Sequence, residues 1–553
     1  MGQFQRLVIA VGLVFNVASI DHASAHIVAR GGTKCSSSKN PFTPEFAKFV
    51  QDNMDFWKIP GIAIAVVDGQ NVFSKGYGFS ALPNTKVTPD TLFYAGSTTK
   101  AQTAACLSSL IQNGSYKSLA QGWLTPISSI LKDDFVLQDQ WATDHLTLED
   151  AVSHRTGIPR HDRSLMREKG GVPLSLKDIV RNLRNLPIPN EPRTKFRYSN
   201  YMYITLSHVI ETVTKKKLKQ VMREMIWDPL GMKSTYFGLQ EANKALGKLA
   251  TGYIWIDQFQ NHSPAAYMPL TDLSGAAAVI SNVRDYAKWI QSLLNQTQLF
   301  SESVHQDILT PRMIQYPLPS NNFDVTLYGL GWYRATLGGL VAYRHDGEII
   351  GFGAQVYLFP DDEFGFVIFA NDDSASTVNA LISRKLIADK FNIPENDILD
   401  VAARFVSSQS WQDHRSSITT SDELFKAAIN RTYPSRPKGQ VNPSSFNMSD
   451  LEGTYCNRGY GNMTLRVGAS KPGDKTLIAE LPEMTWSYGL TFRHIFGDNW
   501  MACESWLEDM LHPGVFHGVE FVKGHDGKPA ALTIKWTAGD EIEGNITYTK
   551  MRK

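Results

Sequence analysis

A serine and a lysine three positions apart could form a nucleophilic pair in this sequence. Ser97 and Lys100 stand in Tyr94-Ala-Gly-Ser-Thr-Thr-Lys100, directly before a long apolar stretch. If that stretch is a helix, the two side chains lie one turn apart on the same face. A serine hydroxyl is a poor nucleophile until a base takes its proton, and a partly desolvated lysine has a pKa low enough to be that base. Backbone N–H groups at the helix start would stabilise an oxyanion formed beside Ser97.

The same Ser-x-x-Lys spacing occurs elsewhere in less suitable surroundings. Two copies fall in irregular stretches rich in Ser and Pro, and a third runs into Asp133-Asp134; they are Ser36–Lys39, Ser435–Lys438 and Ser129–Lys132. Only the copy at Ser97 opens a long apolar helix, which can hold both side chains in a fixed relation. The surroundings therefore select Ser97 as the candidate nucleophile.

Tyr198-Ser-Asn200 is a second candidate pair, immediately before an apolar stretch from 201 to 217. A tyrosine next to a lysine ammonium loses its proton more readily and can serve as a base or a proton relay. The asparagine amide can orient both the lysine and a substrate amide. The alternative is an ordinary turn before a 201–217 helix, in which Tyr198 is only packed. A further match, Tyr455-Cys-Asn457, falls in the C-terminal part of the chain beside a candidate disulfide.

His345-Asp-Gly347 is the third candidate, directly after a β-like stretch at 340–344. The glycine would let a substrate approach the strand closely, and strand N–H groups could complete an oxyanion hole. His-x-Gly recurs twice near the C-terminus in turn-like surroundings. Arg155-Thr-Gly157 is another basic-x-Gly candidate, but the Ile158-Pro159 that follows favours a structural turn.

The elements that must position these motifs change in type along the chain. A helix is predicted at 44–57, and β-like stretches at 61–67 and 72–77 are joined by a tight turn. Mostly helical residues follow from 97 to 300, and strands return at 340–344, 354–359 and 364–369. This order predicts one sheet built from both ends of the segment, with a helical lobe inserted. Residues 451–553 consist of short β-rich pieces, which predict a separate β-domain.

Composition and missing signatures limit the partners. The 55 Lys and Arg residues balance 54 Asp and Glu residues, whereas a nucleic-acid binder normally carries a basic excess. With 42% hydrophobic residues the chain is not intrinsically disordered. The sequence holds no Gly-x-Ser-x-Gly, His-Glu-x-x-His or paired Cys-x-x-Cys pattern. We therefore expect no nucleic-acid partner, no metal and no cofactor.

The N-terminus has the layout of a secretory signal peptide. Arg6 precedes the apolar run Leu7–Phe15, and Ala23-Ser-Ala25 forms a small-residue cleavage pattern before His26. A membrane anchor is the alternative, but the run is shorter than the ~20 apolar residues that a span requires. We therefore expect a secreted protein without a stable membrane anchor.

Secretion would affect the cysteines and the glycosylation sites. Cys35, Cys106, Cys456 and Cys503 allow three pairings in an oxidising compartment. We favour a Cys456–Cys503 disulfide because both lie in the C-terminal segment, whereas Cys106 could equally be a buried thiol on a helix. In a eukaryotic source, glycans could attach at seven Asn-x-Ser/Thr sites, namely Asn113, Asn261, Asn295, Asn430, Asn447, Asn462 and Asn545.

The order of the three motifs resembles the serine β-lactamase and penicillin-binding protein superfamily. Its class C β-lactamase-like branch, peptidase family S12 with D-aminopeptidases and esterases, is the most similar. Further stretches within residues 42–390 resemble that branch, namely Ser153-His-Arg-Thr-Gly157, Trp227-Asp-Pro-Leu-Gly-Met232, Ser274-Gly275 and Tyr328-Gly-Leu-Gly-Trp332. The resemblance implies an α/β (α+β) transpeptidase-like fold, with an antiparallel sheet and an inserted helical lobe. The tail resembles the all-β, lipocalin-like barrel attached to some S12 peptidases.

These observations divide the chain into four parts. We expect a signal peptide at 1–25, a catalytic domain at 40–405, a linker rich in Ser and Pro at 406–450, and a β-barrel domain at 451–553.

The resemblance also implies roles for the motif residues. Ser97 would be the acylated nucleophile, and Lys100 its proton acceptor or electrostatic partner. Tyr198 would act as general base in acylation and activate water in deacylation. Asn200 would support both Lys100 and the substrate.

The third motif would complete the oxyanion hole. The backbone N–H groups of Ser97 and of Glu348, the residue after Gly347, would bind the oxyanion, and one such donor is typically worth ~2.7–4 kcal/mol of barrier. His345 departs from the Lys-Thr-Gly of standard β-lactamases and penicillin-binding proteins. A neutral imidazole binds a substrate carboxylate less well than an ammonium does, which argues against penicillin hydrolysis.

Three functions remain open at this point. The first is a secreted serine hydrolase that cleaves an amide, peptide or ester bond of a small molecule or short peptide through a Ser97 acyl-enzyme. The second is an acyltransferase of the same family, which passes the acyl group to an alcohol or amine of a small-molecule natural product. The third is a non-catalytic binding relative, which the complete set of Ser97, Lys100 and Tyr198 disfavours.

Overall fold

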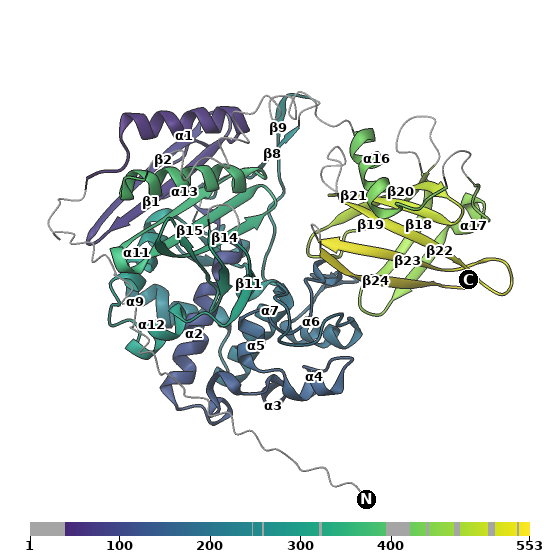
Figure 1. Cartoon of the computed structure of the whole chain (residues 1–553), viewed down its shortest axis with the longest axis horizontal. Helices are drawn as coiled ribbons and strands as arrows, with labels where there is room; N and C mark the ends of the chain where they lie inside the picture. The colour runs from purple at the N-terminus through teal and green to yellow at the C-terminus, as the bar shows by residue number, and fades with distance from the viewer. Residues whose placement is uncertain are drawn as a thin grey trace, which may run out of the picture. The chain divides into compact units, whose positions relative to one another are not determined.

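A nine-stranded antiparallel sheet joins the two ends of the segment 61–370 (Figure 1). The structure is a computed structural model, and it describes residues 39–552 except 246, 257–258, 320–322, 394–420, 438–441, 469–475, 507–514 and 539–540. The expected signal peptide and Cys35 lie outside the described residues. All described residues except Lys39 belong to the unit Asn40–Lys553. Within the described ranges, no helix has the length and apolarity needed to cross a bilayer.

The sheet pairs strands that are far apart in the sequence. β1 runs antiparallel to β16, with Ile64 opposite Ile368, so the expected joining of the two ends is confirmed. In sheet order, the strands are β11 (Met313–Tyr316), β12 (Thr326–Tyr328), β13 (Tyr333–Leu337), β14 (Leu340–Ile349), β15 (Phe352–Phe359), β16 (Phe364–Ala370), β1 (Gly61–Asp68), β2 (Asn71–Ala81) and β3 (Thr85–Lys86).

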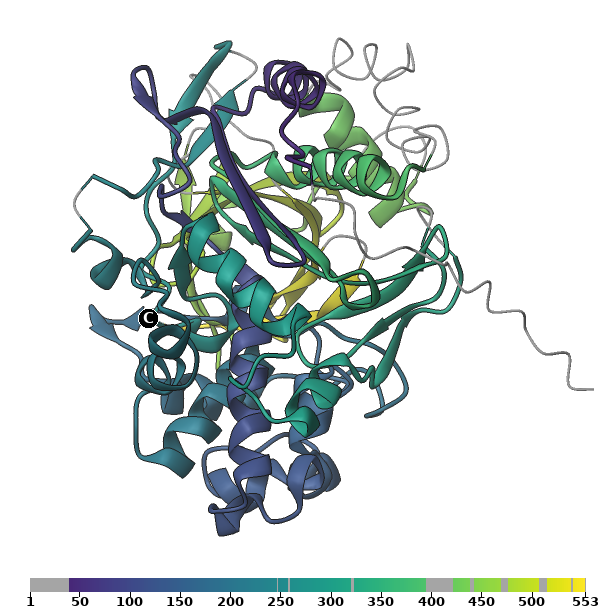
Figure 2. The ribbon, with the colours of Figure 1, turned by 90° about the vertical axis from the view of Figure 1, so that its left-hand side faces the viewer.

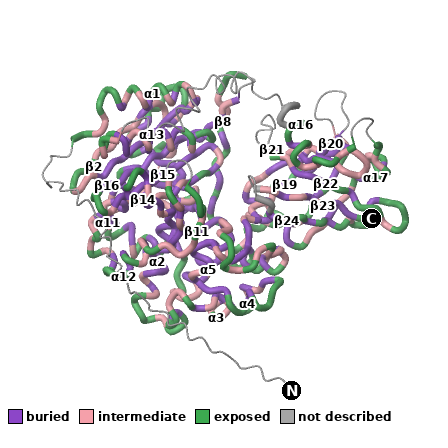
Figure 3. Tube along the Cα trace, in the orientation of Figure 1, coloured by how far each residue is buried: buried purple, intermediate pink, exposed green. Residues whose placement is uncertain are grey.

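Alternation along β1 sends its side chains into two separate cores. The even-numbered residues Ile62–Val66 pack with α1 (Pro44–Trp57) and α13 (Ala375–Phe391), which lie beside each other in Figures 1 and 2. The odd-numbered residues Ala63–Val67 belong to the core shared with the helical lobe. Because both faces are covered, the middle strands of the sheet are buried along their whole length (Figure 3).

The inserted lobe is helical, as its periodicity predicts, and local signals set its helix ends. Thr147 caps α5 (Leu148–Val152) by accepting a hydrogen bond from the N–H of Asp150. The helix at 201–217 ends earlier than expected because Lys215 adopts a left-handed conformation, with φ +59°. The lobe helices are α2 (Thr99–Asn113), α3 (Ile127–Leu131), α4 (Gln140–His145), α5 (Leu148–Val152), α6 (Leu176–Asn182), α7 (Asn200–Thr214), α8 (Leu218–Met222), α9 (Asp228–Leu230), α10 (Leu239–Ala242), α11 (Val283–Leu294) and α12 (Glu302–Leu309).

Small strand pairs complete this part of the chain. Three short strands form a separate sheet whose central member is β10, and it holds the segment that leads into α2. These pieces are β4 (Phe93–Tyr94), β7 (Tyr236–Phe237), β10 (Val279–Ser281), and the two-stranded pairs β5 (Glu168–Lys169) with β6 (Val172–Pro173) and β8 (Tyr253–Ile256) with β9 (Asn261–Pro264).

The C-terminal part is a closed eight-stranded barrel, which confirms the expected β-domain fold. Its strands are β17 (Gly453–Asn457), β18 (Gly461–Gly468), β19 (Thr476–Leu481), β20 (Tyr488–Phe496), β21 (Asn499–Trp506), β22 (Phe516–Lys523), β23 (Pro529–Ala538) and β24 (Glu541–Lys550). The segment expected as a linker contains α16 (Ser421–Thr432), whose Ala428 packs against Ile495 and Met501 of the barrel. The short helix α17 (Met448–Leu451) leads into β17.

The predicted Cys456–Cys503 disulfide is wrong. Cys456 is a free thiol on β17, and Cys503 lies on β21. Four steps around an eight-stranded barrel separate these strands, so the two cysteines lie on opposite walls, whereas a disulfide needs Cα atoms less than about 7 Å apart. Cys106 is a buried free thiol on α2, which agrees with the alternative of a buried thiol on a helix.

The seven sequon asparagines all have accessible positions. Asn295 is half-buried, and the other six are exposed, namely Asn113, Asn261, Asn430, Asn447, Asn462 and Asn545.

Candidate active site

Ser97 lies on a tight turn that joins β4 to α2. The turn, Gly96–Thr98, is a single 3-10 turn, and the hydroxyl of Thr98 donates to the carbonyl of Ala95 at 2.8 Å. Gly96 has φ +52°, and a Cβ built on it would lie 2.8 Å from the backbone nitrogen of Glu348. Only glycine allows the turn to approach β14 this closely.

Lys100 is one helical turn further on and is fully buried. Its Nζ lies 3.1 Å from the Ser97 Oγ, 2.8 Å from the Asn200 Oδ1 and 2.9 Å from the carbonyl oxygen of Ala276. The amide of Asn200 has a defined orientation because its Nδ2 donates to the carboxylate of Asp162 at 3.0 Å. The structure therefore brings together Ser97, Lys100 and Asn200, as the sequence predicts.

These contacts determine what a neutral Lys100 can do. Burial lowers its pKa well below the ordinary 10.5, and the nearby Arg160 lowers it further, against the opposing effect of Asp162. A neutral amine has two hydrogens and one lone pair. The oxygens of Asn200 and Ala276 only accept hydrogen bonds, so they take both hydrogens and leave the lone pair facing the Ser97 hydroxyl.

Tyr198 lies beside the same pair. Its hydroxyl shares a hydrogen bond with Ser97, and the Nζ of Lys100 lies 4.7 Å from the centre of its ring. Burial raises the pKa of Tyr198 above its ordinary value, and the nearby Arg160 and the Ser97 hydrogen bond only partly offset this effect. Tyr198 is therefore protonated at neutral pH, so its hydroxyl has a proton to donate.

The expected oxyanion hole requires the turn at Ser97 and strand β14 to lie in close contact. A Cβ built on Gly347 would lie 2.2 Å from the carbonyl oxygen of Ala95 and 3.0 Å from the backbone nitrogen of Ser97. The corresponding Cβ on Gly96 meets the nitrogen of Glu348. The backbone nitrogens of Ser97 and Glu348 therefore flank the same narrow contact, where two donors could bind one oxyanion.

His345 is buried and neutral. Its Nδ1 donates to the carbonyl oxygen of Asp346 at 2.6 Å, so its Nε2 accepts a hydrogen bond from the hydroxyl of Tyr328 at 3.1 Å. Burial lowers the pKa of His345 to about 4. Both ring nitrogens are used within the protein, so His345 offers no positive charge to a substrate carboxylate.

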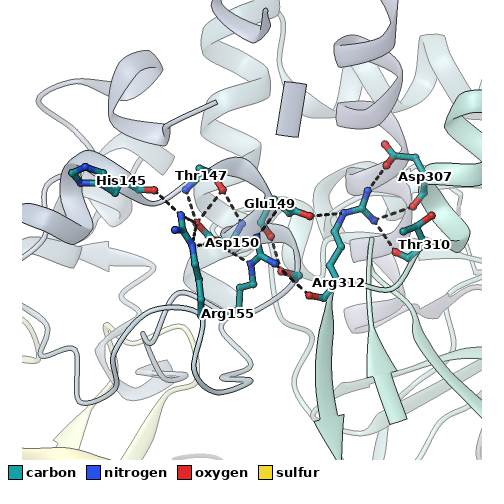
Figure 4. Close-up of polar contacts among 10 residues, drawn as sticks. His145, Thr147, Glu149, Asp150, Arg155, Asp307, Thr310 and Arg312 are labelled. Atoms are coloured by element: carbon teal, nitrogen blue, oxygen red, sulfur yellow. Dashed lines mark hydrogen bonds and ion pairs between the residues drawn. The ribbon is translucent and has the colours of Figure 1, made fainter. Parts of the chain in front are cut away.

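The basic-x-Gly motif at Arg155 is a structural turn. Arg155 contacts Asp150 at 2.7 Å and Glu149 at 2.9 Å, and Arg312 joins the same network through Glu149 (Figure 4). Asp150 also closes the N-terminal capping box of α5 with Thr147. These contacts hold the loop after α5 against β11.

Two further motif matches also lie away from the nucleophile. Ser129 of the Ser129–Lys132 copy is on α3, and Asn457 of the second Tyr-x-Asn match is on β17 of the barrel. Neither residue lines the cavity at Ser97. Of the two copies whose serine and lysine are both among the described residues, the fold combines the one at Ser97 with a Tyr-x-Asn motif.

Sequence reasoning missed the polar residues that the loop after α5 supplies. Arg160 pairs with Asp162 at 2.7 Å, and its guanidinium lies 4.8 Å from the centre of the Tyr198 ring. Both charged residues lie in Ile158-Pro-Arg-His-Asp162. The only sequence signal that could have identified them is their place directly after an apolar turn. A cavity of about 460 Å³ opens onto Ser97, and its lining includes Arg160, Tyr198 and His345.

Known proteins resemble this chain along most of its length. The Beta-lactamase family profile matches residues 46–388. Unguisins hydrolase ungD′ of Aspergillus campestris is 35% identical over 530 residues, which cover 94% of this chain and 95% of that protein.

Solved structures show the same fold. The octameric penicillin-binding protein homologue from Pyrococcus abyssi has a TM-score of 0.56 at 17% identity, covering 91% of this chain and 99% of that one. The D-amino acid amidase from Ochrobactrum anthropi has a TM-score of 0.53 at 21% identity, covering 63% and 99%. The family profile spans more than half of the sequence and the fold agrees with it, so the chain belongs to the β-lactamase family.

Proposed function

We propose that this protein is a serine hydrolase of the β-lactamase family that cleaves an amide bond of a peptide through an acyl-enzyme on Ser97. The observation that carries the proposal is the buried Lys100 Nζ, which lies 3.1 Å from the Ser97 Oγ. Relatives named as hydrolases support this reaction class.

Acylation follows from the contacts of Ser97. Its Oγ attacks the substrate carbonyl carbon while Lys100 takes the hydroxyl proton. The carbonyl oxygen becomes an oxyanion held by the N–H groups of Ser97 and Glu348. The ammonium of Lys100 then returns the proton through the hydroxyl of Tyr198 to the leaving nitrogen. The C–N bond breaks, and the acyl group stays on Ser97.

Deacylation repeats these steps with water. Neutral Lys100, acting through Tyr198, takes one proton of a water molecule whose oxygen attacks the acyl carbon. The ester bond breaks, and the proton returns to the Ser97 Oγ. Tyr198 could serve as a base or as a relay, and its raised pKa favours the relay.

Features of β14 favour a peptide substrate. β13 pairs with β14 only as far as Arg344, so the His345–Ile349 edge next to Ser97 extends beyond that partner. A peptide backbone can bind along such an edge by main-chain hydrogen bonds.

A relative that covers nearly the whole chain is named for unguisins, and we propose unguisin-like compounds as the first substrates to test. Neutral His345 disfavours penicillins, which carry a carboxylate.

We also propose that the chain is secreted. The A-x-A pattern before His26 and the accessible sequon asparagines support this proposal. Expression in a eukaryotic secretory host should release a protein that begins at His26 and loses mass with an endoglycosidase. A secreted chain that kept residues 1–25 would contradict the cleavage site.

Covalent labelling tests the hydrolase. Intact mass after treatment with a fluorophosphonate should show one adduct, and peptide mapping should place it on Ser97. Ser97→Ala should abolish both the adduct and ester hydrolysis. Ser129→Ala, the matched change in another Ser-x-x-Lys copy, should leave both unchanged. A folded protein without a Ser97 adduct would exclude the proposed reaction. Product analysis with an added amine distinguishes hydrolysis from acyl transfer.

A further inference from the structure

A second cavity of about 560 Å³ adjoins the one at Ser97 and is partly walled by the barrel. The two cavities share lining residues, among them Arg160, Glu348 and Trp486. Trp486 belongs to the segment between β19 and β20, so a residue of the C-terminal barrel lines the pocket that opens onto the nucleophile. Tyr488 and Glu504 of the barrel line the second cavity.

Residues of the Trp486 segment and of β21 contact the same loop of the catalytic part. Before Trp486, the N–H of Thr485 donates to the carbonyl of Leu165 at 2.9 Å, and Met484 forms a β-bridge with Met166. On β21, Glu504 accepts from Arg163 at 2.9 Å. These contacts attach the Trp486 segment to the loop that also carries Arg160 and Asp162. The aromatic wall is therefore a fixed part of the site.

The chemistry of the second cavity suits an apolar group. Its lining includes the apolar side chains of Ile349, Ile350 and Phe352 and the aromatic rings of Trp486 and Tyr488. Each of its charged side chains has a partner within the protein: the two arginines pair with two of the carboxylates, and the other two carboxylates accept hydrogen bonds from neutral groups. These pairs are Arg160 with Asp162, Arg163 with Glu504, Glu348 with the hydroxyl of Ser376, and Asp373 with the N–H of Gly351.

The proton relay indicates which half of the substrate reaches this cavity. The leaving nitrogen must lie next to the hydroxyl of Tyr198, which lines the first cavity and is not part of the lining of the second. The acyl half therefore extends the other way, past Glu348 and along Ile349. Its second or third residue from the reacting carbonyl would meet Trp486.

We propose that the barrel-walled cavity is an acyl-side subsite for an apolar or aromatic side chain, and that Trp486 determines specificity there. This inference rests on the proposed function and adds a substrate class to it: peptides of several residues with an aromatic residue upstream of the cleaved bond. A small ester fills only the cavity at Ser97 and does not use the subsite.

Three esters with one leaving group test this subsite. They are p-nitrophenyl acetate and the p-nitrophenyl esters of N-acetyl-Gly-Gly and N-acetyl-Phe-Gly; the last two share a glycine, which leaves no stereocentre next to the reacting carbonyl. The wild-type protein should prefer the phenylalanyl ester over the diglycyl ester by about tenfold or more in kcat/KM, the range of one apolar side chain in a pocket. Trp486→Ala should remove that preference, so that its kcat/KM for the phenylalanyl ester falls to its value for the diglycyl ester.

Control variants separate specificity from folding. Trp486→Phe should retain most of the preference, and Trp141→Ala, a change at an exposed tryptophan on α4, should retain all of it. Two results would overturn the subsite: an equal loss of kcat/KM on all three esters in Trp486→Ala, or a wild-type protein that does not prefer the phenylalanyl ester. In either case, labelling of Ser97 would still support the hydrolase. Absence of Ser97 labelling would overturn both.

Discussion

The imidazole of His154 lies against the phenol ring of Tyr198, with 4.4 Å between the ring centres. The backbone N–H of Ser199 donates to the His154 Nδ1 at 3.1 Å, so the neutral ring carries its proton on Nε2. Burial lowers the pKa of His154 well below its ordinary value, which keeps the ring neutral. His154 therefore positions Tyr198 beside Ser97 without adding a charge to the site.

Replacing His154 should weaken both the fold and the relay. In His154→Phe the ring volume is retained, but the buried N–H of Ser199 loses its acceptor, which costs about 1–3 kcal/mol of unfolding free energy. A displaced Tyr198 should lower kcat for ester hydrolysis by about tenfold with little change in KM. Urea unfolding and steady-state kinetics measure the two effects. His145→Phe, at an exposed histidine on α4, is the control. Wild-type kcat in His154→Phe would show that His154 does not position Tyr198.

Asn200→Asp should shift the acid limb of the pH–rate profile to higher pH. The reaction needs neutral Lys100, and a carboxylate at the position of the Asn200 Oδ1, 2.8 Å from Nζ, favours the ammonium. The pKa of Lys100 should rise by about 1–3 units, so the variant should require a higher pH for the same kcat/KM. Rates of p-nitrophenyl acetate hydrolysis across pH test the shift. Asn457→Asp, in the other Tyr-x-Asn match, should leave the profile in place.

Gly347→Ala should impair acylation. A Cβ there would lie 2.2 Å from the carbonyl oxygen of Ala95, so the turn that carries Ser97 must move away from β14. Losing one oxyanion donor lowers the rate by about 10²–10³. The second-order rate of fluorophosphonate labelling measures this loss. Gly339→Ala, in the turn just before β14, has no neighbour within 4 Å of the added Cβ, so any strain there should leave the labelling rate unchanged. Equal effects of the two variants would argue against an oxyanion role.

Glu543→Gln should stabilise the protein at high pH. Glu543 is buried, and burial raises its pKa to about 7 from its ordinary 4.5, although Arg163, 4.0 Å away, partly opposes this shift. Because the native state holds this proton more tightly than the unfolded state does, stability falls as the pH rises from about 4.5 to about 7. The neutral glutamine avoids that loss, so the unfolding free energy should rise by about 2–3 kcal/mol at pH 8 and not at pH 4.

Glu504→Gln should have the opposite effect. Burial by itself raises the pKa of Glu504, but Arg163 and His517 outweigh burial and lower it to about 2. Its ionised form therefore stabilises the fold at neutral pH, and that contribution is lost as the pH falls from about 4.5 towards 2. Urea unfolding at pH 8 should show a loss for Glu504→Gln and a gain for Glu543→Gln. The same sign for both variants would contradict the assignment of Arg163 to Glu504.

Local patterns in the sequence determined most of the secondary structure. The 44–57 helix has the predicted bounds because Thr43 and Pro44 start it and Lys58 ends it within a few residues. The strands near Gly61 and Phe364 follow from apolar runs bounded by turns. The Ser97–Lys100 pair was also predictable, because one helical turn places these side chains together without help from the rest of the chain.

The tertiary structure decided everything that depends on contacts between distant residues. Asn200 reaches Lys100 across 100 positions, and Trp486 of the barrel reaches the Ser97 cavity from much further along the chain. The Cys456–Cys503 prediction failed because nearness in sequence does not place two strands on the same wall of a barrel. Periodicity and capping act between neighbouring residues, whereas burial, and with it the lowered pKa of Lys100, exists only once the lobe, the sheet and the loop after α5 are packed together.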